Sequence, residues 1–313
     1  MRFFAIDCLP KAARDLAAAS VFLMVLMLAS LVATSAIGAP KAELWERWTA
    51  HNPTSGRTVD HAIWDALTRR YVSRRTDGVA AVAYGRFSAP DKRALDEYLK
   101  TLASTPVSDL GRDEQMAYWL NLYNALTVKV ILDHYPVRSI RDIDISPGLF
   151  ANGPWGAKLI AVEGAELSLD DIEHRILRPI WKDPRIHYGV NCASIGCPDL
   201  KVGAYKAGTL ETDLNAAAET YINHPRGAQV DRGRLLVSSI YTWFQDDFGG
   251  SDAGVIAHLK KYAAPGLQAE LARIDRLYDD RYDWALNDPT LPATNDTSRR
   301  RYDTFNTRGR GGS

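Results

Sequence analysis

Three side chains able to carry out chemistry lie within one short segment, Arg185-Ile-His-Tyr-Gly-Val-Asn-Cys-Ala-Ser-Ile-Gly-Cys-Pro-Asp199. They are His187, Cys192 and Cys197. An imidazole and two thiols at this spacing are compatible with thiol catalysis, with a disulfide and with a metal site. The sequence alone leaves these three interpretations open.

Thiol catalysis would use Cys192 as the nucleophile. A thiol becomes reactive when a neighbouring imidazolium or helix N-terminus lowers its pKa, and the N–H groups of Ala193 and Ser194 could stabilise an oxyanion. We predict residues 186–190 to be a short buried strand, on which His187 and Cys192 would point to opposite faces unless the chain turns between them. By analogy of residue types, the reaction would be acyl transfer by a papain- or transglutaminase-like hydrolase or amidase.

Other polar side chains could complete such a site. His187 or His174 would be the base, and an amide or carboxyl group would orient it, as in Cys-His-Asn sites. Asn121 and Asn124 are three residues apart on one predicted helix, and bonding to the backbone of nearby loops is the commoner use of buried amides. The candidate catalytic residues are Cys192, His187, Asn121, Asn124, Glu173 and His174.

The disulfide interpretation pairs Cys192 with Cys197. Gly196 and Pro198 could bend the enclosed loop, and a bridge would need the two Cα atoms to lie ~4.4–6.8 Å apart. Such a bond would brace the loop, or in a labile form it would be redox-active.

The metal interpretation joins His187, Cys192 and Cys197 around Zn²⁺ or copper, with His174 or Glu173 as a fourth ligand. The even spacing matches none of the usual close pairs of zinc ligands, so the sequence does not determine a metal. No cofactor is predicted.

The element expected to position these residues is a helix over 113–133. Its residues are apolar almost all round, which predicts a central and buried helix. Other helices dominate the chain, and strands are expected in hairpins near 158–169 and 229–237. Because strands and helices do not alternate regularly, we predict an α+β fold: a mainly helical domain around this buried helix, with short β-hairpins and a small sheet.

The N-terminal segment is typical of export. Residues 16–40 carry no charge, follow a weakly basic start and end in small residues near Ala36 and Gly38. This pattern predicts a signal peptide over 1–38 and a periplasmic or secreted mature chain. The alternative is an uncleaved inner-membrane anchor with the chain facing the periplasm, and this is the only membrane contact predicted.

Charge and composition restrict the remaining classes. The chain has 38 Lys and Arg residues and 38 Asp and Glu residues, so its charge gives no reason to expect nucleic acid as a partner. We predict an N-terminal helical region over 40–112, a main domain over 113–286, and a disordered basic tail over 287–313.

Four motifs resemble the bacterial branch of the family called domain of unknown function 547, over roughly 113–286. The resemblance implies membership of that family, whose name assigns no activity and whose catalytic residues are not established. The motifs are Trp119-Leu-Asn-Leu-Tyr-Asn-Ala-Leu126, Leu169-Asp-Asp-Ile-Glu-His-Arg-Ile-Leu177, Ile186-His-Tyr-Gly-Val-Asn-Cys-Ala-Ser194 and Tyr241-Thr-Trp-Phe-Gln-Asp-Asp-Phe248.

The sequence is therefore compatible with two classes of function. One is a thiol-dependent hydrolase. The other is a non-catalytic envelope protein with a structural Cys192–Cys197 disulfide, whose groove, edged by Trp155 and Trp243, would bind a peptide, glycan or small molecule. A binding protein has no need of a low-pKa thiol, so the reactivity of Cys192 separates the two classes.

Overall fold

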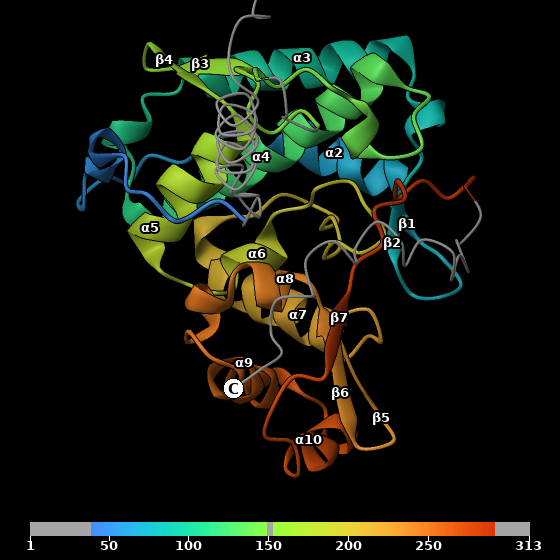
Figure 1. Cartoon of the computed structure of the whole chain (residues 1–313). Coiled ribbons are helices and arrows are strands. Elements are labelled where there is room, and N and C mark those ends of the chain that lie inside the picture. The colour runs from blue at the N-terminus through green and yellow to red at the C-terminus, as the bar shows by residue number, and fades with distance from the viewer. Residues whose placement is uncertain (1–38, 149–152, 292–313) are drawn as a thin grey trace, which may run out of the picture. The chain divides into compact units, whose positions relative to one another are not determined.

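Helix α4, Arg112–His134, lies inside the molecule with nearly every residue from Glu114 to Leu132 buried. A computed structural model describes residues 39–148 and 153–291, which belong to one compact unit. Because α4 is apolar almost all round, it can be covered on every side by other elements, as predicted. Figure 1 shows the resulting arrangement of helices with small sheets, an α+β fold.

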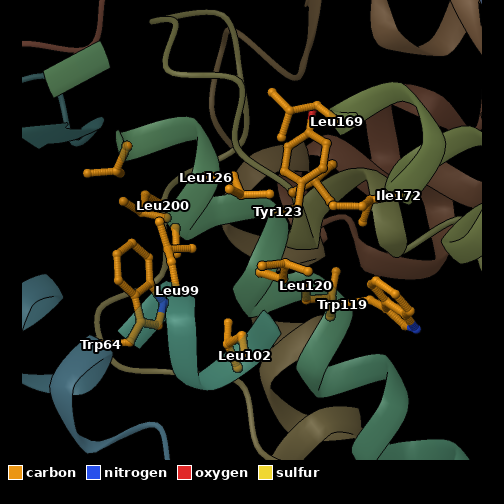
Figure 2. Packing of buried hydrophobic residues seen from close by; sticks show 14 of the residues in the cluster. Trp64, Leu99, Leu102, Trp119, Leu120, Tyr123, Leu126, Leu169, Ile172 and Leu200 are labelled. Atoms are coloured by element: carbon orange, nitrogen blue, oxygen red, sulfur yellow. The ribbon is translucent and has the colours of Figure 1, made fainter. Parts of the chain in front are cut away.

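Helices α2, Ala62–Tyr71, and α3, Ala89–Ser104, pack on one side of this core. The Ser88 hydroxyl caps the start of α3 by accepting from the Asp91 N–H. Figure 2 shows aromatic and aliphatic side chains of the hydrophobic core around α4. They are Trp119, Leu120, Tyr123 and Leu126 of α4, Leu99 and Leu102 of α3, Trp64 of α2, and Leu169, Ile172 and Leu200.

The strands form small sheets. Strands β1, Val72–Arg74, and β2, Ala80–Val82, pair antiparallel. The two predicted hairpins are confirmed: β3, Ile160–Val162, pairs with β4, Ala165–Leu167, and β5, Ala228–Asp231, pairs with β6, Arg234–Ser238. Strand β7, Asp279–Arg281, adds in parallel to β6.

The remaining helices and helical turns complete the fold. Before α4 these are η2, Glu46–Thr49, η3, Tyr84–Arg86, and η4, Val107–Asp109. After it come η5, Ile140–Asp142, the π-helix η6, Asp171–Leu177, α5, Arg178–Trp181, and η7, Ala207–Thr209. The last are α7, Leu210–Ile222, α8, Ile240–Trp243, η8, Gln245–Phe248, α9, Asp252–Tyr262, and α10, Pro265–Leu271.

The predicted strand over 186–190 is wrong: Ile186–Gly189 is the single helical turn α6. A short apolar run fits either the helical or the strand period, and here Pro184 and the Asp183 side chain, which accepts from the Arg185 N–H, start a helical turn. This turn joins two core clusters, because Ile186 packs in one and Tyr188 in the other.

The structure bears on the predicted C-terminal boundary but not on the N-terminal one. Residues 1–38, predicted as a signal peptide or anchor, lie outside the described residues. The tail predicted from Asn287 starts too early, because Asn287 and Asp288 are both 1% exposed and the Tyr84 hydroxyl donates to Asn287 Oδ1. Among the described residues no helix is both long enough and apolar enough to cross a membrane.

Candidate functional site

The Cys192 loop follows α6 directly, and the Asn191 side chain closes it. Asn191 Nδ2 donates to the Pro198 carbonyl at 2.7 Å, and Asn191 Oδ1 accepts from the Ala193 N–H at 3.0 Å. Ala193 adopts φ 59°, in the left-handed region. This conformation is energetically unfavourable for any residue that carries a Cβ atom. The loop is therefore held in one defined shape that presents Cys192.

The loop also pairs with the segment over 282–287. The Gly196 N–H donates to the Asp283 carbonyl at 2.8 Å, and the Asn287 N–H donates to the Ala193 carbonyl at 3.1 Å. These bonds bring Tyr282, which is 90 residues away in the sequence, to the Cys192 thiol. Sequence reasoning missed Tyr282, since a contact of this range leaves no local pattern.

Gly196 is required for this close approach. A Cβ atom at this position would lie 2.7 Å from the Asp283 backbone nitrogen and 3.0 Å from Tyr282 Cδ1. We expect Gly196→Ala to lower the free energy of unfolding by about 1–3 kcal/mol and to raise the pKa of Cys192 as Tyr282 moves away. Thermal unfolding and the pH profile of alkylation measure both effects.

The matched control is Gly208→Ala, since a Cβ there would meet nothing within 4 Å. Equal unfolding temperatures and equal alkylation profiles for the two variants would contradict the role given to Gly196.

Hydrogen-bond donors converge on the partly exposed Cys192 thiol. The Tyr282 hydroxyl lies 3.0 Å and the Ser194 hydroxyl 3.3 Å from its sulfur. The hydrogen bond from the Cys197 thiol lowers the pKa of Cys192 most; burial opposes it, and the Ser194 and Tyr282 hydroxyls and the Ser194 N–H bring the pKa to about 7. These groups stabilise a thiolate near neutral pH.

Both cysteines are free thiols in the structure. The Cys192 N–H donates to Cys197 Sγ at 3.0 Å, so Cys197 lies against the Cys192 backbone, and a hydrogen bond joins the two thiols without a covalent bond. In the described part of the chain, no three His, Cys, Asp or Glu side chains are grouped so that they could hold a metal ion. The predicted ligand set of His187, Cys192 and Cys197 is therefore not assembled.

His187 faces two carboxyl groups instead of the thiol. Its Nε2 lies 2.6 Å from Asp247 Oδ2, and its Nδ1 lies 3.6 Å from Glu173 Oε1. The ring stacks on Phe244 at 4.4 Å, and burial lowers its pKa although Asp247 opposes this shift. The direct His187–Cys192 pair predicted from the sequence is not formed.

Glu173 belongs to this cluster, and the charge of Cys192 affects its pKa through space. It lies on the π-helix η6, an irregular form often found at functional sites. Burial raises the pKa of Glu173 to about 8; Arg178 and a hydrogen bond with Tyr123 oppose the shift, and the charges of Asp170 and Cys192 add to it. At neutral pH Glu173 is therefore a protonated acid within the electrostatic range of Cys192.

His174, the other predicted base, belongs to the same buried cluster but is hydrogen-bonded to Arg178. The Arg178 guanidinium donates to His174 Nδ1 at 3.0 Å, and its Nε donates to Asp247 Oδ2 at 2.6 Å. Burial and the charge of Arg178 hold the pKa of His174 well below its ordinary value. Sequence reasoning missed Arg178 and Asp247, although Asp247 stands in one of the quoted motifs.

The asparagines of α4 bond to backbone, as the commoner use of buried amides predicted. Asn124 Nδ2 donates to the Gly189 carbonyl at 2.9 Å, and its Oδ1 accepts from the Asn191 N–H at 2.8 Å. Asn121 makes the same pair of bonds to Tyr205, each at 2.9 Å. Asn124 thus positions the Cys192 loop, whereas Asn121 holds a different loop.

Aromatic rings gather beside the thiol. Tyr282 contacts Trp243 with ring centroids 4.8 Å apart and Trp284 at 4.6 Å. Trp155 packs against Trp284 at 5.7 Å. The predicted edge residues Trp155 and Trp243 therefore belong to one aromatic cluster, which reaches Cys192 through Tyr282.

Residues 107–222 match the family model described as "Protein of unknown function, DUF547". The chain carries a DUF547 region. The predicted resemblance is confirmed over residues 107–222, and the matched residues include Cys192, Glu173, His187 and Asn124. Asp247 and Tyr282 lie beyond the match. Neither the curated proteins nor the solved structures contain a match to the chain.

Proposed function

We propose that the protein is an exported, thiol-dependent acyl-transfer enzyme, a hydrolase or amidase, with Cys192 as its nucleophile. The observation that carries this proposal is the set of donors around the Cys192 sulfur, from Tyr282, Ser194 and Cys197. A thiol with a pKa near the ambient pH combines a large thiolate fraction with high nucleophilicity.

The same donors serve the transition state. When the thiolate attacks a carbonyl carbon, the C–S bond forms and the negative charge moves from sulfur to the carbonyl oxygen. The Tyr282 hydroxyl then loses the thiolate as an acceptor and becomes available to the oxyanion, while the Ser194 hydroxyl donates to the Tyr282 oxygen at 3.0 Å and orients it. The Ala193 N–H predicted for this role is bonded to Asn191 Oδ1. The Tyr282 hydroxyl therefore takes the place of Ala193 as the proposed oxyanion donor.

Glu173 would move the proton. In its protonated form it can donate to the leaving group as the tetrahedral intermediate collapses to a thioester. As a carboxylate it can then take a proton from the water that hydrolyses the thioester. His187, held by Asp247, faces the Glu173 carboxyl and is proposed as its positioning residue.

The aromatic cluster of Trp155, Trp243, Tyr282 and Trp284 would form the substrate-binding edge. Aromatic rings offer apolar faces with polar tips, which suit a peptide or a glycan chain carrying the acyl group. The proposed reaction needs no cofactor. The protein would contact the membrane only if its N-terminal segment stays uncleaved.

Alkylation of Cys192 by iodoacetamide tests the proposal. With a pKa of about 7, the thiolate fraction at pH 6 is about 10%, against about 0.3% for an ordinary thiol of pKa about 8.5. Lower intrinsic nucleophilicity offsets part of this about 30-fold gain, so we expect labelling about 5-fold faster than that of an unfolded control. Intact mass against pH measures the rate and its midpoint.

Cys192→Ser supplies the control, since it removes the nucleophile and keeps a side chain of similar shape. The folded chain, but not this variant, should also gain one acyl group from an activated acyl ester. Labelling only after reduction would instead favour the binding protein with a structural disulfide. A midpoint of the alkylation rate near pH 8.5 would show that the Cys192 thiol is not activated.

A further inference from the structure

Cys197 stands beside the proposed nucleophile and is enclosed by the protein. Its side chain is 5% exposed, whereas Cys192 is partly exposed. The hydrogen bonds of Asn191 across the loop hold both thiols in place without a covalent link. The loop thus keeps an accessible thiol and an enclosed thiol in contact, which is the arrangement of an attacking and a resolving cysteine.

We infer that Cys192 and Cys197 form a dithiol that reduces disulfide compounds by thiol–disulfide exchange, with Cys192 attacking and Cys197 resolving. This activity uses the same nucleophile as acyl transfer, but it involves no acyl-enzyme and does not rest on that proposal.

Thiol–disulfide exchange takes place in two steps. The Cys192 thiolate attacks one sulfur of a substrate disulfide, a new S–S bond forms, and the substrate S–S bond breaks. Cys197 then attacks the Cys192 sulfur, and the mixed disulfide breaks. The substrate leaves as two thiols, which take up the proton of Cys197 and one from solvent or buffer. The substrate disulfide gains two electrons, and the dithiol becomes a Cys192–Cys197 disulfide.

The surroundings of Cys197 give this order of events. Burial raises the pKa of Cys197 well above its ordinary value, and the hydrogen bond and charge of Cys192 raise it further. Once Cys192 is in a mixed disulfide, that charge is gone, while the Cys192 N–H, which lies 3.0 Å from Cys197 Sγ in the dithiol, can still donate to it. Cys197 therefore becomes a better nucleophile only after Cys192 has reacted.

Glutathione disulfide is the first probe. The full chain and Cys197→Ser are incubated with mixtures of reduced and oxidised glutathione, quenched with acid, alkylated and weighed intact. We expect the unaltered chain to form an internal disulfide and to carry the glutathione adduct at about a tenth or less of the Cys197→Ser level, because a neighbouring thiol has a high effective concentration. Cys192→Ser should form neither product.

An aromatic disulfide, 5,5′-dithiobis(2-nitrobenzoate), gives a second measurement that needs no variant. We expect each chain to release two thiolates in sequence and to retain no adduct. Release of one thiolate with a lasting adduct, or equal glutathione adducts on the chain and on Cys197→Ser, would overturn the inference. The acyl-ester labelling of Cys192 is scored separately, so failure of either activity is recognised by itself.

Discussion

Replacing Glu173 with Gln is expected to lower acyl transfer by about 10²–10⁴-fold while the alkylation of Cys192 continues at nearly its original rate. Iodoacetamide needs only the thiolate, and the donors that stabilise this thiolate are Tyr282, Ser194 and Cys197. Acyl transfer also needs a proton for the leaving group. The variant therefore separates a proton-transfer role of Glu173 from a role in activating the thiol.

The same variant changes the dependence of stability on pH. Burial raises the pKa of Glu173 to about 8, so the folded chain keeps this proton while the unfolded chain loses it above about pH 4. The folded chain then binds more protons than the unfolded chain, and the stability from this group falls as the pH rises from about 4 to 8. By pH 7 the loss is about 3 kcal/mol.

Glutamine resembles the protonated acid and cannot ionise, so Glu173→Gln should be more stable than the unaltered chain at pH 8 and similar at pH 4. Denaturant unfolding at both pH values measures the difference. Glu219→Gln on the exposed face of α7 is the matched control, and it should shift neither value. Equal losses of alkylation and acyl transfer in Glu173→Gln would refute the role as an acid.

The fold was predictable where one local pattern decided the structure. Helix α4 is apolar almost all round, and α3 starts at a capping residue, so both could be placed from the sequence. The turn α6 was predicted as a strand because four residues contain too little periodicity to distinguish a helix from a strand. Its structure depends on the two core clusters that it joins.

The candidate site was predictable by residue type but not by partner. Cys192, Glu173 and the histidines were identified, yet the sequence offered no means of pairing His187 with Asp247, which is 60 residues away. The same holds for Tyr282 and Cys192. Such pairs are created by packing between distant elements, so side chains that are neighbours in the sequence, such as His187 and Cys192, can serve different parts of a site.

The second large effect concerns the buried charges that support this cluster. We expect Arg178→Met to lower the free energy of unfolding by about 3–5 kcal/mol, because Asp247 loses the guanidinium that bonds its carboxylate inside the protein. The Arg178 side chain is 5% exposed, so little solvent can replace its hydrogen bonds. Denaturant unfolding at pH 7 measures the loss.

The pH dependence of this variant gives a sharper test. Although burial opposes it, hydrogen bonds from His187 and Arg178 hold the pKa of Asp247 well below its ordinary value. A carboxyl group with a lowered pKa stabilises the fold above its unfolded pKa of about 4, and this contribution disappears as the pH falls below that value. Arg178→Met should therefore lose less stability than the unaltered chain between pH 4 and pH 2.

Arg57→Met is the matched control, since Arg57 and Asp109 form an ion pair at 3.0 Å with side chains 62% and 59% exposed. Exposed pairs contribute about 0–1 kcal/mol, so this variant should be nearly neutral. Similar losses for the two variants would show that the burial of Arg178 does not govern its effect. A large loss confined to Arg178→Met, with Cys192 alkylated as before, would show that the burial of Arg178 governs its effect on stability and that the loop activates the thiol without the charged cluster.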